Sequence, residues 1–227
     1  MNANGFPTVG GDALKFKHPF SLMVCGPSGS GKTRWILNLV KHRDAVITPK
    51  ITRVVYSYRA YQKAFDDAIA EGLKIEFVYG DDYTIDPSEN TLLIVDDQLL
   101  NSSFPLGHTF TVRVHHESLS CVFVTHNLFH KDPEFRLASL NAHYVALFKS
   151  IRNVGQVNTL ARQLFTHDRE KARKMIKAYS LATRDPYTYL LIDLRPCTPD
   201  HVRLRSHALP DEGPTFGAIK LTKTYPL

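Results

Sequence analysis

Gly26-Pro27-Ser28-Gly29-Ser30-Gly31-Lys32-Thr33 is the stretch that decides the fold of this 227-residue chain. An apolar segment of strand character, Pro19–Cys25, leads into it, and a segment with apolar residues at helical spacing, Lys32–Arg43, follows it. Glycines let consecutive backbone N–H groups converge on phosphate oxygens, and the N-terminus of the following helix adds the positive end of its dipole. The pattern G-x-x-x-x-G-K-[ST] between a strand and a helix therefore predicts a phosphate-binding loop rather than an accidental Gly/Ser-rich turn.

The side chains of this loop predict a nucleotide together with its metal ion. We expect the residues from Gly26 to Thr33 to bind the phosphates of ATP. Lys32 is expected to reach the β- and γ-phosphates, which makes it a catalytic as well as a binding residue, and the Thr33 hydroxyl is expected to coordinate Mg²⁺.

A second expected strand ends in two carboxylates. The expected strand Thr91–Asp96 contains the apolar run Leu92–Val95 and ends in Asp96, which Asp97 follows directly. In a sheet that carries a phosphate loop, one acid at such a strand end holds Mg²⁺, and the next can orient or deprotonate the attacking water. We assign Asp96 to the metal and Asp97 to the water. Two solvated acids at a strand end are the alternative, and the phosphate loop makes that alternative the weaker one.

The order of the segments favours ATP over GTP. Two expected strands, Arg53–Tyr58 and Lys74–Val78, come between the loop and the acid pair. This spacing suits the ATPase branch, whose sheet contains an additional central strand. The Asn-Lys-x-Asp motif with which GTPases recognise guanine does not occur in the sequence.

Strands and helices alternate along the rest of the chain, which predicts an α/β fold with a mostly parallel sheet flanked by helices. Further strands are expected at Cys121–Thr125, Tyr144–Phe148, Tyr187–Leu194 and Val202–Arg205, and further helices at Tyr61–Glu71, Glu134–Leu140, 155–166 and 169–182. We divide the chain into an irregular lead-in (1–18), a P-loop ATPase domain (19–206) and a tail containing proline and glycine (207–227).

The polar end of the strand Cys121–Thr125 is a further candidate. If this strand lies beside the acid-bearing one, the sequence Thr125-His126-Asn127 faces the γ-phosphate and can sense it by hydrogen bonding. We take Asn127 as the catalytic candidate among them. An Asn/His turn explains each of these residues nearly as well.

Basic residues follow the strand Tyr144–Phe148. Arg152 and Arg162 are candidates for an arginine that completes the transition-state charge at the γ-phosphate of a neighbouring subunit, although a solvated helix face explains them equally well. The expected helix 169–182 carries a basic stripe, which fits either solvated surface or contact with a DNA backbone.

Composition favours polyanionic partners, with a net charge of +6 and an isoelectric point near 9.2. No apolar run approaches the roughly 20 residues that span a bilayer, and the N-terminus lacks the pattern of a signal peptide, so we expect neither a membrane protein nor a secreted one. Cys25, Cys121 and Cys197 are expected to be buried free thiols in a reducing compartment.

In combination, these segments resemble the genome-packaging ATPases of large DNA viruses and Polinton-like elements, within the FtsK–HerA superfamily of P-loop ATPases. The matching segments are His18–Phe20, Gly26–Thr33, Leu92–Asp97, Val124–Phe129, Leu140–Tyr144, Leu147–Arg152, Leu160–Gln163 and Tyr189–Asp193. The family often has glutamine where this chain has His126, which puts a sensing role for that residue in doubt.

The resemblance implies a RecA-like core with the additional strand and the catalytic acid. It also implies a homo-oligomeric ring around double-stranded DNA and a capsid or portal-like viral protein as partner. The site of action that it implies is the host cytoplasm or nucleus, where virions assemble, or the virion itself.

Two functions of different classes follow. The first is an ATP-hydrolysing DNA translocase that packages viral double-stranded DNA into a capsid. The second is an ATP-gated module for nucleic-acid binding or assembly with little turnover. Asp97 beside Asp96 favours the first, because a switch has less need of a second acid. A small-molecule phosphotransferase is a weaker third candidate, since no lid-like arginine pattern occurs.

Overall fold

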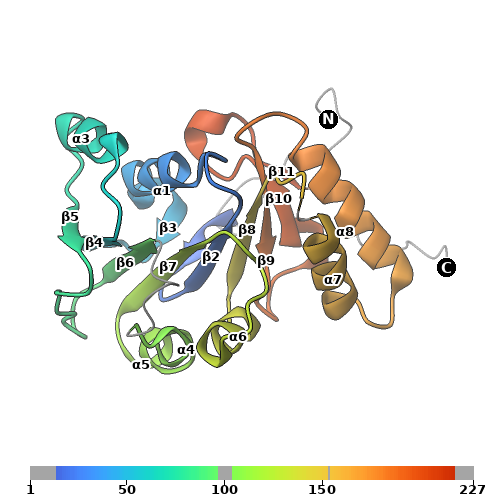
Figure 1. The fold of residues 1–227 in the computed structure, drawn as a ribbon, viewed down its shortest axis with the longest axis horizontal. Helices are drawn as coiled ribbons and strands as arrows, with labels where there is room; N and C mark the ends of the chain where they lie inside the picture. Colours follow the sequence, from blue (N-terminus) through green and yellow to red (C-terminus); the bar gives the residue numbers. More distant parts are fainter. Residues whose placement is uncertain (1–13, 97–103, 153, 218–227) are drawn as a thin grey trace.

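A twisted sheet covered by helices on both faces organises the protein (Figure 1). The computed structural model describes residues 14–96, 104–152 and 154–217. Within these residues, nine strands form one sheet. From edge to edge they are β11 (Phe216–Gly217), β10 (Leu204–Ser206), β9 (Tyr189–Asp193), β8 (Tyr144–Phe148), β2 (Ser21–Cys25), β7 (Leu119–Thr125), β6 (Thr91–Asp96), β4 (Arg53–Tyr58) and β5 (Glu76–Tyr79).

The sheet has a parallel block and an antiparallel extension. Strands β8, β2, β7, β6, β4 and β5 run parallel to one another, whereas the pairings of β8 with β9, β9 with β10 and β10 with β11 are antiparallel. Every residue of β2, β6, β7 and β8 is buried. Apolar runs of this kind suit strands that are covered on both faces, as parallel strands usually are. The predicted α/β fold with a mostly parallel sheet is therefore confirmed.

Helices cover each face with a separate core. On one face α1 (Lys32–Lys41) and α3 (Lys63–Ala70) pack against the sheet, and on the other lie α6 (Pro133–Leu140), α7 (Val154–Leu164) and α8 (Arg169–Ala182). Strand alternation divides the side chains between the cores, so that Met23 points to the second face while Leu22 and Val24 point to the first. The shorter helical segments are α2 (Arg43–Val46), α4 (Leu106–His108), a π-helical turn (Thr109–Arg113), α5 (Val114–His116) and α9 (Asp200–Arg203).

The expected bounds of β4, β6, β8 and α8 are confirmed, but the strand expected at Val202–Arg205 is wrong. Its first half belongs to α9, and β10 begins only at Leu204. The Asp200 carboxylate accepts hydrogen bonds from Lys171 and Arg203, which fastens this helical turn to α8. Val202 and Leu204 are both buried, and their spacing in sequence fits a strand as well as this turn.

Two further expectations need correction. The lead-in is not wholly irregular, because Phe16–Lys17 forms strand β1, which pairs with β3 (Ile47–Thr48). Cys197 is exposed, whereas Cys25 and Cys121 are buried free thiols as expected. A helical region at 106–116 was not predicted, although its buried residues Leu106, Phe110 and Val114 recur every four positions.

The described part of the C-terminal tail packs on the domain. Leu209 is buried, and the Tyr189 hydroxyl lies 2.6 Å from a Glu212 carboxylate oxygen. Strand β11 then pairs with β10 at the sheet edge. A search of the described helices finds none with the length and apolar character that a membrane crossing requires.

A buried charge cluster holds the antiparallel extension together. The Asp193 carboxylate, at the end of β9, lies 2.7 Å from a guanidinium nitrogen of Arg195 and 3.2 Å from one of Arg205 on β10. Asp193 and Arg205 are both fully buried. Arg205 also donates to the Leu14 carbonyl at 2.8 Å, so the cluster connects the start of the described chain to the extension.

Replacing Asp193 with alanine should lower the free energy of unfolding by about 3–5 kcal/mol, because it leaves two buried or half-buried guanidinium groups without their carboxylate. Denaturant titration measures the change. Glu170→Ala, which removes a surface ion pair with Lys174, is the control and should cost less than about 1 kcal/mol. Equal losses in the two variants would contradict a structural role for the buried cluster.

Candidate nucleotide-binding site

The loop between β2 and α1 has a backbone that only its glycines suit. Gly29 and Gly31 have φ angles of +73° and +96°, in the left-handed region that other residues avoid. The Ser30 N–H donates to the Pro27 carbonyl at 3.2 Å, which closes the turn. Gly31 is the N-cap of α1, and because glycine has no side-chain oxygen it leaves the first N–H groups of the helix to an external acceptor.

Gly26 has no room for a side chain. A Cβ atom built there would lie 2.7 Å from the Phe148 Cβ on β8 and 2.8 Å from the Ser30 hydroxyl oxygen. The Gly26 N–H continues the strand ladder by donating to the Thr125 carbonyl at 3.1 Å. The loop therefore begins as a tight turn that packs against both β7 and β8.

The Lys32 ammonium is folded over the loop. Its Nζ donates to the Gly26 carbonyl at 2.7 Å and to the Pro27 carbonyl at 3.0 Å, and the residue is only 8% exposed. These bonds hold a positive charge at the centre of the turn. Backbone curvature, a helix N-terminus and a fixed cation together form a cradle that suits phosphate oxygens.

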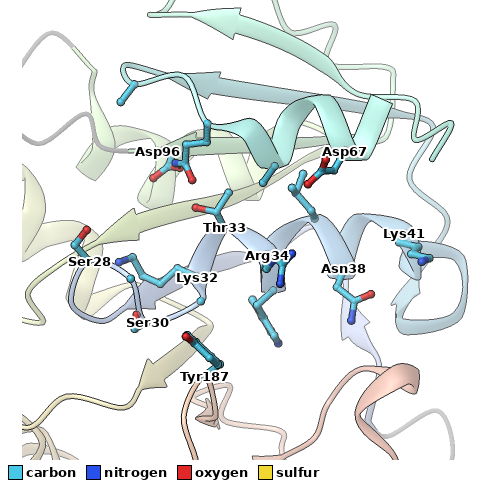
Figure 2. A pocket seen from close by; sticks show the side chains of 18 of the residues that line it. Ser28, Ser30, Lys32, Thr33, Arg34, Asn38, Lys41, Asp67, Asp96 and Tyr187 are labelled. Atoms are coloured by element: carbon cyan, nitrogen blue, oxygen red, sulfur yellow. The ribbon is translucent and has the colours of Figure 1, made fainter. Parts of the chain in front are cut away.

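The Asp96 carboxylate lies beside the first turn of α1 (Figure 2). Asp96 Oδ2 accepts hydrogen bonds from the Tyr56 hydroxyl at 2.8 Å and from Gln62 Nε2 at 3.3 Å. Thr33 lies on the first turn of α1 and lines the same cavity as Asp96. Burial, followed by the charge of Asp96, raises the pKa of Tyr56 well above its usual value, so this hydroxyl stays protonated and remains a donor.

The strand register brings these groups together at the carboxyl ends of the parallel strands. Cys25 pairs with Thr125 on β7 and with Leu147 on β8, and Asp96 pairs with Val124. The carboxyl ends of four parallel strands therefore lie together, where α/β proteins commonly bind their ligands. Strand β7 lies beside the acid-bearing β6, which is the neighbourhood expected for the polar sequence Thr125-His126-Asn127.

A cavity of about 910 Å³ opens at this edge. Its lining combines the loop with the acid-bearing strand end, the segment after β4, the outer side of α1 and the residues before β9. Among the residues that line it are Ser28–Thr33, Arg59, Gln62, Asp96, His126 and Tyr187. The volume accommodates a nucleotide, and the polar groups converge on the loop.

The structure brings together some predicted residues and not others. Gly29–Thr33 and Asp96 line one cavity, and His126 lines it too. Asn127 is exposed, is not among the lining residues, and accepts a weak bond from Gln156 at 3.5 Å. The Thr125 hydroxyl donates to the Asn127 carbonyl at 3.0 Å, as in a turn.

Of the three other candidate residues, two do not line the cavity and one lies outside the residues that the structure describes. Arg152 follows β8 and Arg162 lies on α7, and both are exposed without lining the cavity. Asp97 lies outside the described residues.

Several residues in or beside the cavity were not predicted. Tyr56 lies in the middle of an apolar strand, where a tyrosine gives no sign of a buried polar contact. Arg59 and Gln62 follow that strand, and a search of each strand end for polar residues would have found them. Tyr187 has φ +63°, which no pattern in the sequence indicates.

No protein-family model matches the chain, and a search of curated proteins finds no significant match. The function is therefore inferred from the geometry of the site and the chemistry of its residues.

Gly26→Ala should destabilise the protein by about 1–3 kcal/mol, because Phe148 is buried and cannot yield to the added methyl group. Thermal and denaturant unfolding measure the change. Gly155→Ala is the control, since a Cβ there meets nothing within 4 Å. A Gly26→Ala variant as stable as the control would show that the loop is not tightly packed against β8.

Proposed function

We propose that this protein binds ATP with Mg²⁺ at the β2–α1 loop and hydrolyses it to move double-stranded DNA. The observation that carries the first part is that the buried Asp96 carboxylate, held by Tyr56 and Gln62, lines the same cavity as Lys32 and Thr33 of the glycine turn. A fixed cation, a hydroxyl and a buried carboxylate around a glycine turn suit a polyphosphate with its metal ion.

Each residue has a defined part in this proposal. Thr33 and Asp96 would hold Mg²⁺, which when bound neutralises charge on the β- and γ-phosphate oxygens. Tyr56 and Gln62 fix the orientation of the Asp96 carboxylate by donating to it. Lys32 would exchange its bonds to the loop carbonyls for bonds to phosphate oxygens. Asp97 is the proposed base for the attacking water.

The strand order supports the ATPase branch of the P-loop proteins. Strand β7 lies between the loop-bearing β2 and the acid-bearing β6, as the additional central strand of that branch does. His126 lines the cavity from the end of this strand, so in this chain it takes the place proposed for the residue that senses the γ-phosphate, ahead of Asn127.

The charge distribution supports head-to-tail association of subunits. On α8 the exposed residues Arg169, Arg173 and Lys177 recur every four positions and form a basic row. On α3 Asp66 and Asp67 are exposed acids. Figure 1 places α3 and α8 at opposite ends of the molecule. Opposite charges at opposite ends favour head-to-tail association, which closes into a ring when the rotation permits.

The resemblance to genome-packaging ATPases supplies the rest of the proposal. It suggests that the DNA is viral, that a capsid or portal-like protein receives it, and that the work takes place where virions assemble in the host cytoplasm or nucleus. A motor must hold every base pair that passes, so its contact with DNA is expected to be with the backbone and independent of sequence.

ATP hydrolysis by the wild-type protein should rise when duplex DNA is added, and Lys32→Ala should abolish it by removing the charge at the β- and γ-phosphates. Asp97→Asn should keep ATP bound while slowing hydrolysis by roughly 10²-fold or more. A phosphate-release assay with and without DNA measures both effects. ATP binding with negligible turnover, unchanged by DNA, would instead identify an ATP-gated module.

Mixing subunits tests the arginines. If Arg152 or Arg162 acts on the nucleotide of a neighbour, an Arg152→Ala/Arg162→Ala protein mixed with a Lys32→Ala protein should regain part of the lost activity. The first still offers an intact loop and the second still offers the arginines; an added arginine is worth about 10³–10⁵ in rate. Arg136→Ala, at an exposed position on α6, is the control and should hydrolyse ATP normally. Mixed rings without recovered activity would exclude action across the interface.

A further inference from the structure

Tyr187 lies against the phosphate loop on the side away from Asp96 (Figure 2). It precedes β9 and lines the same cavity. A Cβ atom built on Gly31 would meet the Tyr187 Cβ and Cδ1 atoms at 3.3 Å, so the aromatic residue packs directly on the last glycine of the loop. Nevertheless, 70% of the tyrosine remains exposed.

The backbone holds this residue in an unfavourable conformation. Tyr187 has φ +63°, which brings the Cβ of a bulky residue too close to its own carbonyl oxygen. The neighbouring turn is fixed, because the Thr188 hydroxyl donates to the Asp185 carbonyl at 2.7 Å and the Lys149 N–H donates to the Thr188 carbonyl at 3.2 Å. Strain of this kind, held in place by its surroundings, is characteristic of ligand sites.

The residues proposed to hold the metal ion indicate in which direction a bound polyphosphate would run through the loop. In the proposed site Thr33 and Asp96 would hold the metal ion that accompanies the β- and γ-phosphates, so the terminal phosphate would lie towards them. The remainder of the nucleotide must then leave the loop on the other side. Figure 2 shows Tyr187 on that side, across the loop from Asp96. An exposed aromatic ring therefore stands where the nucleoside emerges.

We propose that Tyr187 stacks on the base of the bound nucleotide, an inference that rests on the proposed function of the loop. Stacking uses the aromatic face and not hydrogen-bond recognition, so it strengthens the binding of any nucleoside triphosphate relative to inorganic polyphosphate. The left-handed backbone at position 187 orients the ring beside Gly31, and a side chain at position 31 would crowd the ring. Tyr187 is thus a specificity residue for the nucleoside, separate from the residues that hold the phosphates.

The test compares two ligands on three proteins. Magnesium-ATP and magnesium tripolyphosphate are titrated calorimetrically into the wild type, Tyr187→Asn and Tyr187→Phe. Asparagine tolerates a positive φ, so the first variant removes the ring without opposing the backbone, and the second retains the ring without the hydroxyl. Tyr187→Asn should weaken ATP roughly 5- to 150-fold and leave tripolyphosphate unchanged, whereas Tyr187→Phe should resemble the wild type.

Other outcomes overturn the inference in distinguishable ways. If Tyr187→Asn weakens both ligands equally, the ring only supports the loop. If it weakens neither, the base does not contact this residue. If the wild type binds neither ligand, the proposed nucleotide site itself fails, and Lys32→Ala serves as the reference for that result because it should lose both ligands.

Discussion

Parallel hydrogen bonding between β8, β2, β7 and β6 is the constraint on which the rest of this structure depends. It aligns the ends of the strands so that Cys25 pairs with both Thr125 and Leu147, and the loop starts where that pairing stops. A slip of one residue would turn every side chain to the opposite face. Since these strands are buried on both faces, the two apolar cores oppose any such slip and thereby fix the site.

The site itself contains groups that do not favour folding. Lys32 and Asp96 are 8% and 6% exposed, and burying a charge is costly unless hydrogen bonds replace the lost water. The Lys32 ammonium donates such bonds to the loop carbonyls, and the Asp96 carboxylate accepts them from Tyr56 and Gln62. A phosphate that binds in the loop must compete with those carbonyls for the ammonium. We therefore expect phosphate binding to be coupled to the conformation of the loop.

Sequence patterns predicted the features that local chemistry determines. The apolar runs gave the bounds of β4, β6 and β8, and the glycine spacing predicted the loop, because both patterns have few alternatives. Contacts between distant segments were not predictable. The role of Tyr56 arises from its cross-strand neighbour Asp96, and the placing of Tyr187 arises from a backbone angle that the side chain itself disfavours. For the same reason the boundary between α9 and β10 depends on ion pairs to α8.

In the proposed function, the parallel and antiparallel parts of the sheet position different groups of the nucleotide site. The parallel block provides the cradle, the cation and the carboxylate, all at one edge. The antiparallel strand β9 begins just after Tyr187, so the ring reaches the cradle only if β9 keeps its register with β8, where Phe148 pairs with Tyr189. That register is secured at the other end of β9 by the buried ionic cluster of Asp193. The cluster lies at the opposite end of the strand from the loop, yet it fixes the residue that we assign to the nucleoside. In this proposal, recognition of the phosphates and recognition of the base depend on separate sets of contacts, which the pairing of β8 with β9 connects.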